Sequence, residues 1–223
     1  MPDGQYSFYL HSDDRTDIAA MATISTISQP LRGEFIRTAA TAGAVVYQVD
    51  ARLPALIPVF FAGQLSAVRL CAVMALVSGT WSSLTGLPDE PENGEAALPV
   101  SPETEYQRRR YTLTLQNGRS GERVESVLTE ASSRLRGDLL RNLIITGLAL
   151  HTTAPELPRL LASMPVPPTS VSELQALVQQ MAGTADVNRA AAAVPDTPAT
   201  SAVPVSGSDT REIKKNMRRA FGD

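Results

Sequence analysis

The sequence has one cysteine, two histidines and few aromatic residues. The single cysteine, Cys71, excludes an intrachain disulfide framework, and the lack of a signal peptide favours a reducing, cytoplasmic location. Neither metal-ligand spacing nor a Gly-rich phosphate loop is present, so the sequence predicts no metal, no cofactor and no enzymatic activity. With five Phe, five Tyr and one Trp, the cores must consist mainly of Ala, Leu, Val and Ile.

The sequence also lacks a large net charge and a segment long enough to span a membrane. The net charge of −3 excludes a uniformly basic nucleic-acid-binding chain. The apolar run 53–77 is interrupted by prolines, a glycine and a charge, leaving pieces shorter than the ~20 residues that a spanning helix needs. It predicts two buried helices, 53–62 and 64–78, with the Cys71 thiol packed rather than reactive.

What the sequence does contain is a duplication. At a constant offset of 104, nine residues recur: Ser28, Leu31, Arg32, Gly33, Arg37, Gly43, Leu53, Pro54 and Leu56 match Ser132, Leu135, Arg136, Gly137, Arg141, Gly147, Leu157, Pro158 and Leu160. Two copies are too few for a solenoid and suit an internal, single-chain dimer.

Each copy is preceded by a short alternating segment, YSFYLH at 6–11 and YTLTLQ at 111–116. The period of two turns Tyr6, Phe8, Leu10, Tyr111, Leu113 and Leu115 inward. It turns Ser7, Tyr9, His11, Arg110, Thr112, Thr114 and Gln116 outward. A lone strand needs a partner, so the two strands are expected to pair antiparallel, within one chain or between chains. The predicted fold is mainly α with a short antiparallel β ribbon.

The stretch SQPLRGEFIRTAATAGAVVYQVDARLPALI, with FYLHSDD before it, resembles the ParR/StbB group of plasmid partition proteins. The most specific elements are FYLHSDD, RGEFIR and RLPALI. The resemblance implies a ribbon-helix-helix DNA-binding fold, here as two tandem units forming a pseudo-dimer, with extra C-terminal helices and a disordered tail. Known members have one unit and dimerise, so the duplication departs from their pattern.

The predicted segments follow from the repeat and from composition. They are unit 1 at 1–78, a linker at 79–105, unit 2 at 106–183, a disordered spacer at 184–208 and a partner-binding peptide at 209–223. In unit 2, the expected helices are 121–131, 134–151, 156–163 and 170–182, the last capped by Ser170 or Ser172.

A two-stranded ribbon fits the major groove of DNA, where its outward side chains read base edges. The predicted readers are Ser7, Tyr9, His11, Arg110, Thr112, Thr114 and Gln116. The predicted phosphate anchors lie at the start of the second helix of each unit, at Ser28, Arg32, Gly33, Ser132, Arg136 and Gly137. If the strands pair within one chain, the DNA site should not be palindromic. Gly43 and Gly147 are expected where the two second helices cross closely.

The C-terminal DTREIKKNMRRAFGD carries an apolar stripe flanked by basic residues. The residues predicted to bind a partner are Ile213, Lys214, Lys215, Met217, Arg218, Arg219 and Phe221. The resemblance implies an actin-like ATPase filament of the ParM type as that partner. A basic tail that adds nonspecific DNA affinity is the alternative, although it gives the apolar stripe no role.

The predicted function is that of a centromere-binding adaptor for plasmid segregation, clustered on repeated sites in double-stranded DNA and possessing no catalytic residues. The resemblance also implies repression of its own operon. The alternatives are a ribbon-helix-helix repressor without a motor partner and a structural scaffolding protein.

Overall fold

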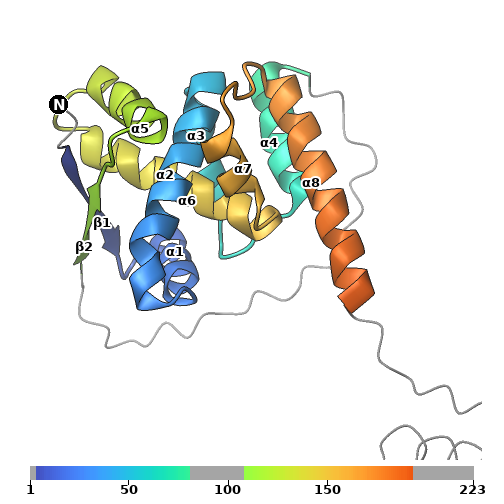
Figure 1. The fold of residues 1–223 in the computed structure, drawn as a ribbon, viewed down its shortest axis with the longest axis horizontal. Coiled ribbons are helices and arrows are strands. Elements are labelled where there is room, and N and C mark those ends of the chain that lie inside the picture. Colours follow the sequence, from blue (N-terminus) through green and yellow to red (C-terminus); the bar gives the residue numbers. More distant parts are fainter. Residues whose placement is uncertain (1–3, 81–107, 193–223) are drawn as a thin grey trace, which may run out of the picture. The chain divides into compact units, whose positions relative to one another are not determined.

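The computed structural model describes residues 4–80 and 108–192, with side chains placed for 4–80 and 108–183. Within these ranges the chain forms eight α-helices and one two-stranded sheet (Figure 1). Contacts divide the chain into two units, Met1–Asn188 and Arg189–Asp223, and the first contains both repeats. The predicted partner peptide, 209–223, and nearly all of the predicted linker lie outside the described residues.

The first repeat consists of one strand followed by helices. Its elements are β1 (Gln5–His11), α1 (Arg15–Ser25), the 3₁₀ turn η1 (Gln29–Leu31), α2 (Arg32–Val49), α3 (Leu53–Leu56), the 3₁₀ turn η2 (Ile57–Phe60) and α4 (Ala67–Ser78). Asp14 caps α1, accepting a bond from the backbone N–H of Asp17 at 2.9 Å. Ser66 caps α4 in the same way, and Gly79 ends that helix with a φ of 71°.

The second repeat has the same order of strand and α-helices. Its elements are β2 (Arg108–Thr114), α5 (Arg119–Glu130), α6 (Arg136–Thr153), α7 (Leu157–Ser163) and α8 (Val171–Ala192). Every helix of this repeat begins 104 residues after its counterpart in the first repeat, which extends the duplication seen in the sequence over the whole unit. Ser170, one of the two predicted caps, accepts from the backbone N–H of Glu173 at 3.3 Å.

Several helix bounds differ from the prediction. The helix expected at 53–62 is a single turn of α-helix followed by η2, where Pro58 supplies no N–H donor to continue the α-helical bonding. The helix expected at 64–78 begins only at Ala67, after its cap. The helix expected to end at 182 continues to Ala192, because residues 183–192 contain alanines with high helix propensity. Its last part therefore falls within the predicted spacer.

The two strands pair with each other in one chain. β1 runs antiparallel to β2, and the register places Ser7 opposite Thr112, near the middle of the ribbon. The inner face carries the predicted apolar side chains, of which Phe8, Leu10 and Leu113 are almost completely buried. Phe8 also stacks on Tyr111, the residue opposite it, with ring centroids 5.3 Å apart.

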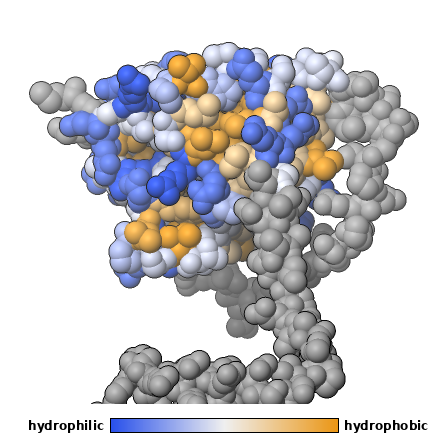
Figure 2. Space-filling model, turned by 45° about the vertical axis from the view of Figure 1, so that its right-hand side comes forward, coloured by the Kyte–Doolittle hydropathy of each residue, from blue (hydrophilic) through white to orange (hydrophobic). Residues whose placement is uncertain are grey.

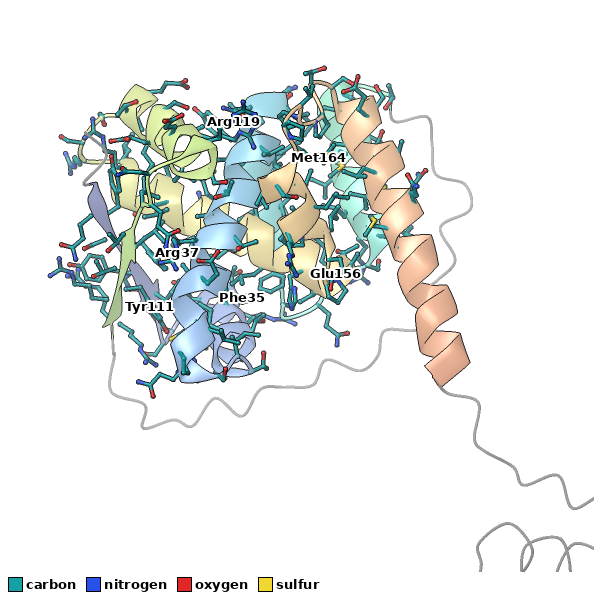
Figure 3. The ribbon with its side chains drawn as sticks, in the orientation of Figure 1. Phe35, Arg37, Tyr111, Arg119, Glu156 and Met164 are labelled. Carbon is teal, nitrogen blue, oxygen red and sulfur yellow. The ribbon has the colours of Figure 1, made fainter. Side chains whose placement is uncertain are left out.

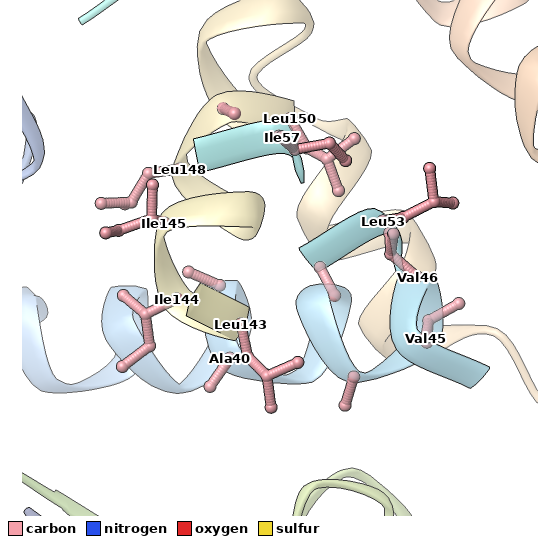
Figure 4. Packing of buried hydrophobic residues seen from close by; sticks show 14 of the residues in the cluster. Ala40, Val45, Val46, Leu53, Ile57, Leu143, Ile144, Ile145, Leu148 and Leu150 are labelled. Atoms are coloured by element: carbon pink, nitrogen blue, oxygen red, sulfur yellow. The ribbon is translucent and has the colours of Figure 1, made fainter. Parts of the chain in front are cut away.

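The largest interface between the repeats is the crossing of α2 and α6 (Figure 4). A Cβ atom added to Gly43 would overlap the backbone carbonyl of Leu143, and one added to Gly147 would overlap that of Ala39. Since Ala39 and Leu143 are themselves 104 residues apart, the two contacts are related by an approximate two-fold axis. The prediction of a close crossing at both glycines is confirmed.

The apolar stretch 53–77 contributes to the shared core instead of forming one long helix. Leu53, Ile57, Leu70 and Met74 from this stretch are fully buried. In the parts of the chain that the structure describes, none of the helices is both long enough and apolar enough to cross a membrane.

Replacement of Gly43 by alanine should destabilise the protein, because the new methyl group must push the backbone of α6 away from α2. We expect a loss of about 1–3 kcal/mol in the free energy of unfolding, measured by urea denaturation. Gly33→Ala is the matched control. Its added Cβ would lie 3.7 Å from the nearest heavy atom, on Arg37, so this variant should be neutral or slightly more stable. Equal losses in both variants would contradict the crossing.

Candidate nucleic-acid interface

The outer face of the ribbon carries polar and charged side chains from both strands. The register pairs them across the ribbon as Gln5 with Thr114, Ser7 with Thr112, Tyr9 with Arg110 and His11 with Arg108. The side chains on β2 are exposed, whereas Ser7, Tyr9 and His11 on β1 are half-buried. The structure therefore brings together, on one surface, all the outward residues that the sequence predicts on the two strands. Gln116 follows the end of β2 and is also exposed.

One end of this face is cationic and aromatic. The guanidinium of Arg110 donates to the Ser7 hydroxyl, with Nη2 at 2.9 Å. Arg108 lies over the Tyr9 ring, 3.9 Å from its centroid. These contacts hold planar donors against the ribbon, since a guanidinium stacks favourably on an aromatic ring. The parallel N–H donors of a guanidinium can bond to two neighbouring acceptors at once, so these side chains suit a surface that presents acceptors in pairs.

The other end is polar and uncharged, with Gln5 opposite Thr114 and Gln116 beyond them. Amide and hydroxyl groups both donate and accept hydrogen bonds, so this end suits a mixed donor–acceptor surface. Ser7 and Thr112 occupy the same place in YSFYLH and YTLTLQ, which lie 105 residues apart, and they face each other in the ribbon, so an approximate two-fold axis also relates the two strands. The ribbon is thus two-fold symmetric in its backbone and asymmetric in its chemistry.

Arg108 and Gln5 are outward residues that the sequence prediction omitted. The period of two that selected Arg110 and Ser7 also selects them, because Arg108 precedes Arg110 by two and Gln5 precedes Ser7 by two. The alternation could therefore have found both, whereas the pairing of Arg110 with Ser7 required the register.

The arginines predicted as phosphate anchors are held by the protein itself. Nε of Arg32 donates to the Ile27 carbonyl at 2.8 Å, and Nη2 donates to that of Ser25 at 3.2 Å. In the second repeat, Nε of Arg136 donates to the Ala131 carbonyl at 3.2 Å. Both arginines therefore satisfy carbonyls at or just past the C-terminal end of the preceding helix. A role towards phosphate stays a prediction for both residues.

The remaining predicted anchors lie where the second helices begin. Ser28 and Ser132 are exposed, and each accepts, through its backbone carbonyl, a bond from the leucine three residues later. Gly33 is exposed at the start of α2. Gly137 is partly covered by β1, since its Cβ position lies 3.5 Å from the Ser7 carbonyl oxygen. The start of α6 therefore lies directly beneath the strand of the other repeat.

Two cavities flank the ribbon at equivalent positions. One, of about 610 Å³, lies between the end of β1 and the start of α6, where Asp13, Asp14 and Asp138 face Arg108 and Arg134. The other, of about 680 Å³, lies between the loop after β2 and the N-terminal half of α2, and Arg37 and Arg119 line it. Figure 3 labels Arg37 and Phe35 on α2, Arg119 at the start of α5 and Tyr111 on the ribbon.

Among the described residues, a buried ion pair links the repeats on the first flank and has no counterpart on the second. Asp17, which is fully buried, accepts from Nε of Arg141 at 2.7 Å and from the His11 backbone N–H at 2.8 Å. Burial raises the pKa of the Asp17 carboxyl, while the His11 N–H and the Arg141 guanidinium oppose that rise. The sequence prediction missed this pair, because no local pattern connects residues so far apart.

The second flank has lost the equivalent carboxylate. Gly121 stands in place of Asp17, and a Cβ there would overlap the Gln116 carbonyl, so the loop after β2 closes over that position. Arg37, the counterpart of Arg141, bonds instead to Glu34 on its own helix, through Nη2 at 2.6 Å. This pair is far more exposed than the buried one, and within the described residues the second flank has no ion pair between the repeats, although Phe35 contacts the His151 ring edge-on across it.

No cluster of side chains in residues 4–80 and 108–183 has the composition of a metal site. Cys71 is half-buried on α4, and burial raises the pKa of its thiol, as expected for a packed cysteine. The fold and its surface define a helical protein with a duplicated strand-and-helices unit and a two-stranded ribbon exposed on one side.

The family comparison matches this duplication. The family model described as plasmid stability protein matches residues 4–74 and 109–178, segments that coincide with the two repeats. The chain belongs to the plasmid stability protein family. Comparison with curated proteins and with solved structures gives no match.

Removal of the Asp17 charge tests the link between the repeats. Asp17→Asn removes the buried carboxylate from Arg141 and leaves it the half-exposed Asp14 at 3.3 Å, so we expect a loss of about 1–3 kcal/mol in the free energy of unfolding at neutral pH. The control is Glu34→Gln, which breaks the exposed pair at the equivalent arginine and should cost at most about 0.5 kcal/mol. Similar midpoints of urea denaturation for the two variants would contradict a structural role of the buried pair.

Proposed function

We propose that the protein is a centromere-binding adaptor of a plasmid segregation system. It binds repeated sites in double-stranded DNA through its ribbon and engages an actin-like ATPase filament through residues 209–223. The proposal rests on membership in the plasmid stability family and on the exposed, polar outer face of a ribbon supported by helices. We read the arrangement as two fused ribbon-helix-helix units in one chain, acting in the cytoplasm without catalysis.

The single observation that carries DNA binding is the pairing of β1 with β2. A two-stranded ribbon is narrow enough to enter the major groove, where each base pair presents a distinct set of donors and acceptors. Arg110 and Arg108 suit the paired acceptors of guanine, while Thr112 and Thr114 suit a thymine methyl or a hydrogen-bonding edge. The helices α2 and α6 both contact the ribbon, and the backbone N–H groups at their N-termini can donate to phosphate.

Asymmetry of the ribbon implies a non-palindromic site. The cationic end should prefer G·C pairs and the uncharged end should tolerate A·T pairs, so one chain reads two different half-sites. This reading differs from that of a symmetric homodimer, whose two strands are identical and whose site is an inverted repeat.

Arg110→Ala should relax sequence preference at one end of the DNA site and leave the other end unchanged. We expect a loss of about 1–3 kcal/mol in discrimination against a wrong base, measured by competition binding with duplexes mutated one base pair at a time. Arg52→Ala, just before α3 and beyond the C-terminal end of α2, is the control and should leave all affinities unchanged. Equal relaxation at both ends would contradict the asymmetric reading, and absence of duplex binding by the unaltered protein would overturn DNA recognition itself.

Deletion of residues 208–223 should separate DNA binding from filament binding. Duplex affinity should persist, while co-sedimentation with filaments of the plasmid's actin-like ATPase and retention of the plasmid should both be lost. Replacing Ile213, Met217 and Phe221 with serine should have the same effect, because an apolar stripe anchors a helix in a groove. Replacing Arg211 with glutamine is the control for simple charge, and it should leave filament co-sedimentation intact. Unchanged plasmid retention after the deletion would favour a repressor without a motor partner.

The adaptor should also repress its own operon if a site overlaps the promoter. A scaffolding role without DNA would be favoured if the unaltered protein bound no duplex and still assembled into larger particles. The genomic neighbourhood offers a cheap check, since the proposal requires an actin-like ATPase gene and an array of short DNA repeats nearby.

A further inference from the structure

The cavity on the second flank combines apolar and charged side chains. Leu31, Phe35, Ala39 and Leu115 are among the apolar residues that line it, whereas the cavity on the first flank is lined almost entirely by polar and charged side chains. Its volume of about 680 Å³ lies in the range of protein cavities that hold small organic molecules. A cavity of this size and mixed lining suits a ligand with an apolar body and a polar group.

The two repeats differ in side-chain size where they line this cavity. Ala39 and Thr41 line it from α2. Leu143 and Ile145 stand at the equivalent positions of α6 and are fully buried. The second flank therefore has less side-chain volume at these positions than the first, which leaves room for a ligand.

The first flank also has two carboxylates that the second flank lacks. Asp14 and Asp17 each lie beside Arg141, with a carboxylate oxygen 3.3 Å and 2.6 Å from its Nη2. Glycines, Gly118 and Gly121, stand at the equivalent positions and line the second cavity. The arginines of the second flank therefore receive no carboxylate from the helix that corresponds to α1.

Cationic side chains reach the second cavity from three helices. Arg37 in α2, Arg119 in α5 and Arg159 in α7 all line it. Arg37 is paired with Glu34, whereas the side chains of Arg119 and Arg159 have no hydrogen-bonding or ion-pair partner in the part of the chain that the structure describes. Glu34 and Glu156 are the carboxylates in the lining, so the arginines outnumber them and the lining favours an anion.

We propose that this cavity binds a small organic acid that has an apolar body and one carboxylate. The carboxylate lies against Arg119 and Arg159, because a guanidinium offers a carboxylate two parallel donors. The apolar body lies against Leu115 and Phe35, whose ring contacts the His151 ring edge-on with centroids 5.0 Å apart. In Figure 3, Phe35 and Arg37 mark the α2 side of the cavity and Arg119 marks the α5 side.

Exposed apolar atoms alone would not mark a binding site on this protein. Figure 2 shows apolar side chains in small groups among hydrophilic ones over one face of the molecule. The cavity differs because its apolar lining is combined with arginines that have no protein partner. A bound acid would contact α2 from the first repeat and α5 from the second, so it should also raise the thermal midpoint of unfolding.

The test titrates the full chain with 2-naphthoate, which joins an apolar ring system to one carboxylate. The chain has two histidines, and their imidazole NMR signals report on both flanks, because His151 lines the second cavity and His11 the first. We expect the His151 signal to shift saturably and the His11 signal to stay in place. The uncharged 2-naphthalenemethanol should bind about tenfold more weakly. Acetate, which has no apolar body, should shift neither signal at the same concentration.

The double variant R119Q/R159Q should bind 2-naphthoate about tenfold more weakly than the unaltered chain. Its thermal midpoint without ligand should not change, because both arginines are exposed. The matched control is R123Q/R134Q, which removes two arginines of the same repeat that do not line this cavity and should keep the affinity.

Four outcomes would overturn the proposal. They are the absence of any shift with 2-naphthoate, equal shifts of both histidine signals, equal affinity for the uncharged alcohol, and equal affinities of the two double variants. The inference goes beyond the proposed function and does not depend on it. Since no step uses DNA or a filament, failure of the unaltered chain to bind duplex DNA would count against the proposed function alone.

Discussion

The close crossing of α2 and α6 is the constraint on which the rest of the structure depends. A glycine within a helix costs about 1 kcal/mol relative to alanine, and each of these helices has one at the crossing. That cost is offset by contact between backbones that side chains would otherwise hold apart. The crossing brings the start of α6 beneath β1, as the contact between Gly137 and Ser7 shows, and so sets where the ribbon lies.

The ribbon in turn depends on both repeats for stability. Two strands alone are marginal in water, and here their inner face is buried on helices from both halves of the chain. Covalent fusion removes the concentration dependence of a homodimer, because strand and helix partners are always present at the same effective concentration. Asp17 and Arg141 add a polar link across the same boundary, on one flank only.

The duplication, the alternation of the strands and the glycine crossing could be predicted because each is a pattern of spacing in the sequence. The pairing of Asp17 with Arg141 could not, since it depends on which loop lies over the start of α6. The position of Arg32 likewise depends on where α1 ends, which a local pattern does not fix. The length of α8 was underestimated because its spacer-like composition also contains good helix formers.

Residues on the two-fold axis and residues away from it differ in which substitutions they tolerate. At the axis, Gly43 and Gly147 are identical, and Ser7 faces Thr112, a residue of similar chemistry. Away from it the halves diverge: Asp17 is replaced by Gly121, and the exposed Val68 and Leu76 of α4 by Ser172 and Gln180 of α8. A homodimer must change both halves at once, so a change that helps one flank can harm the other. In a fused chain each flank changes alone, while the crossing preserves the shared geometry.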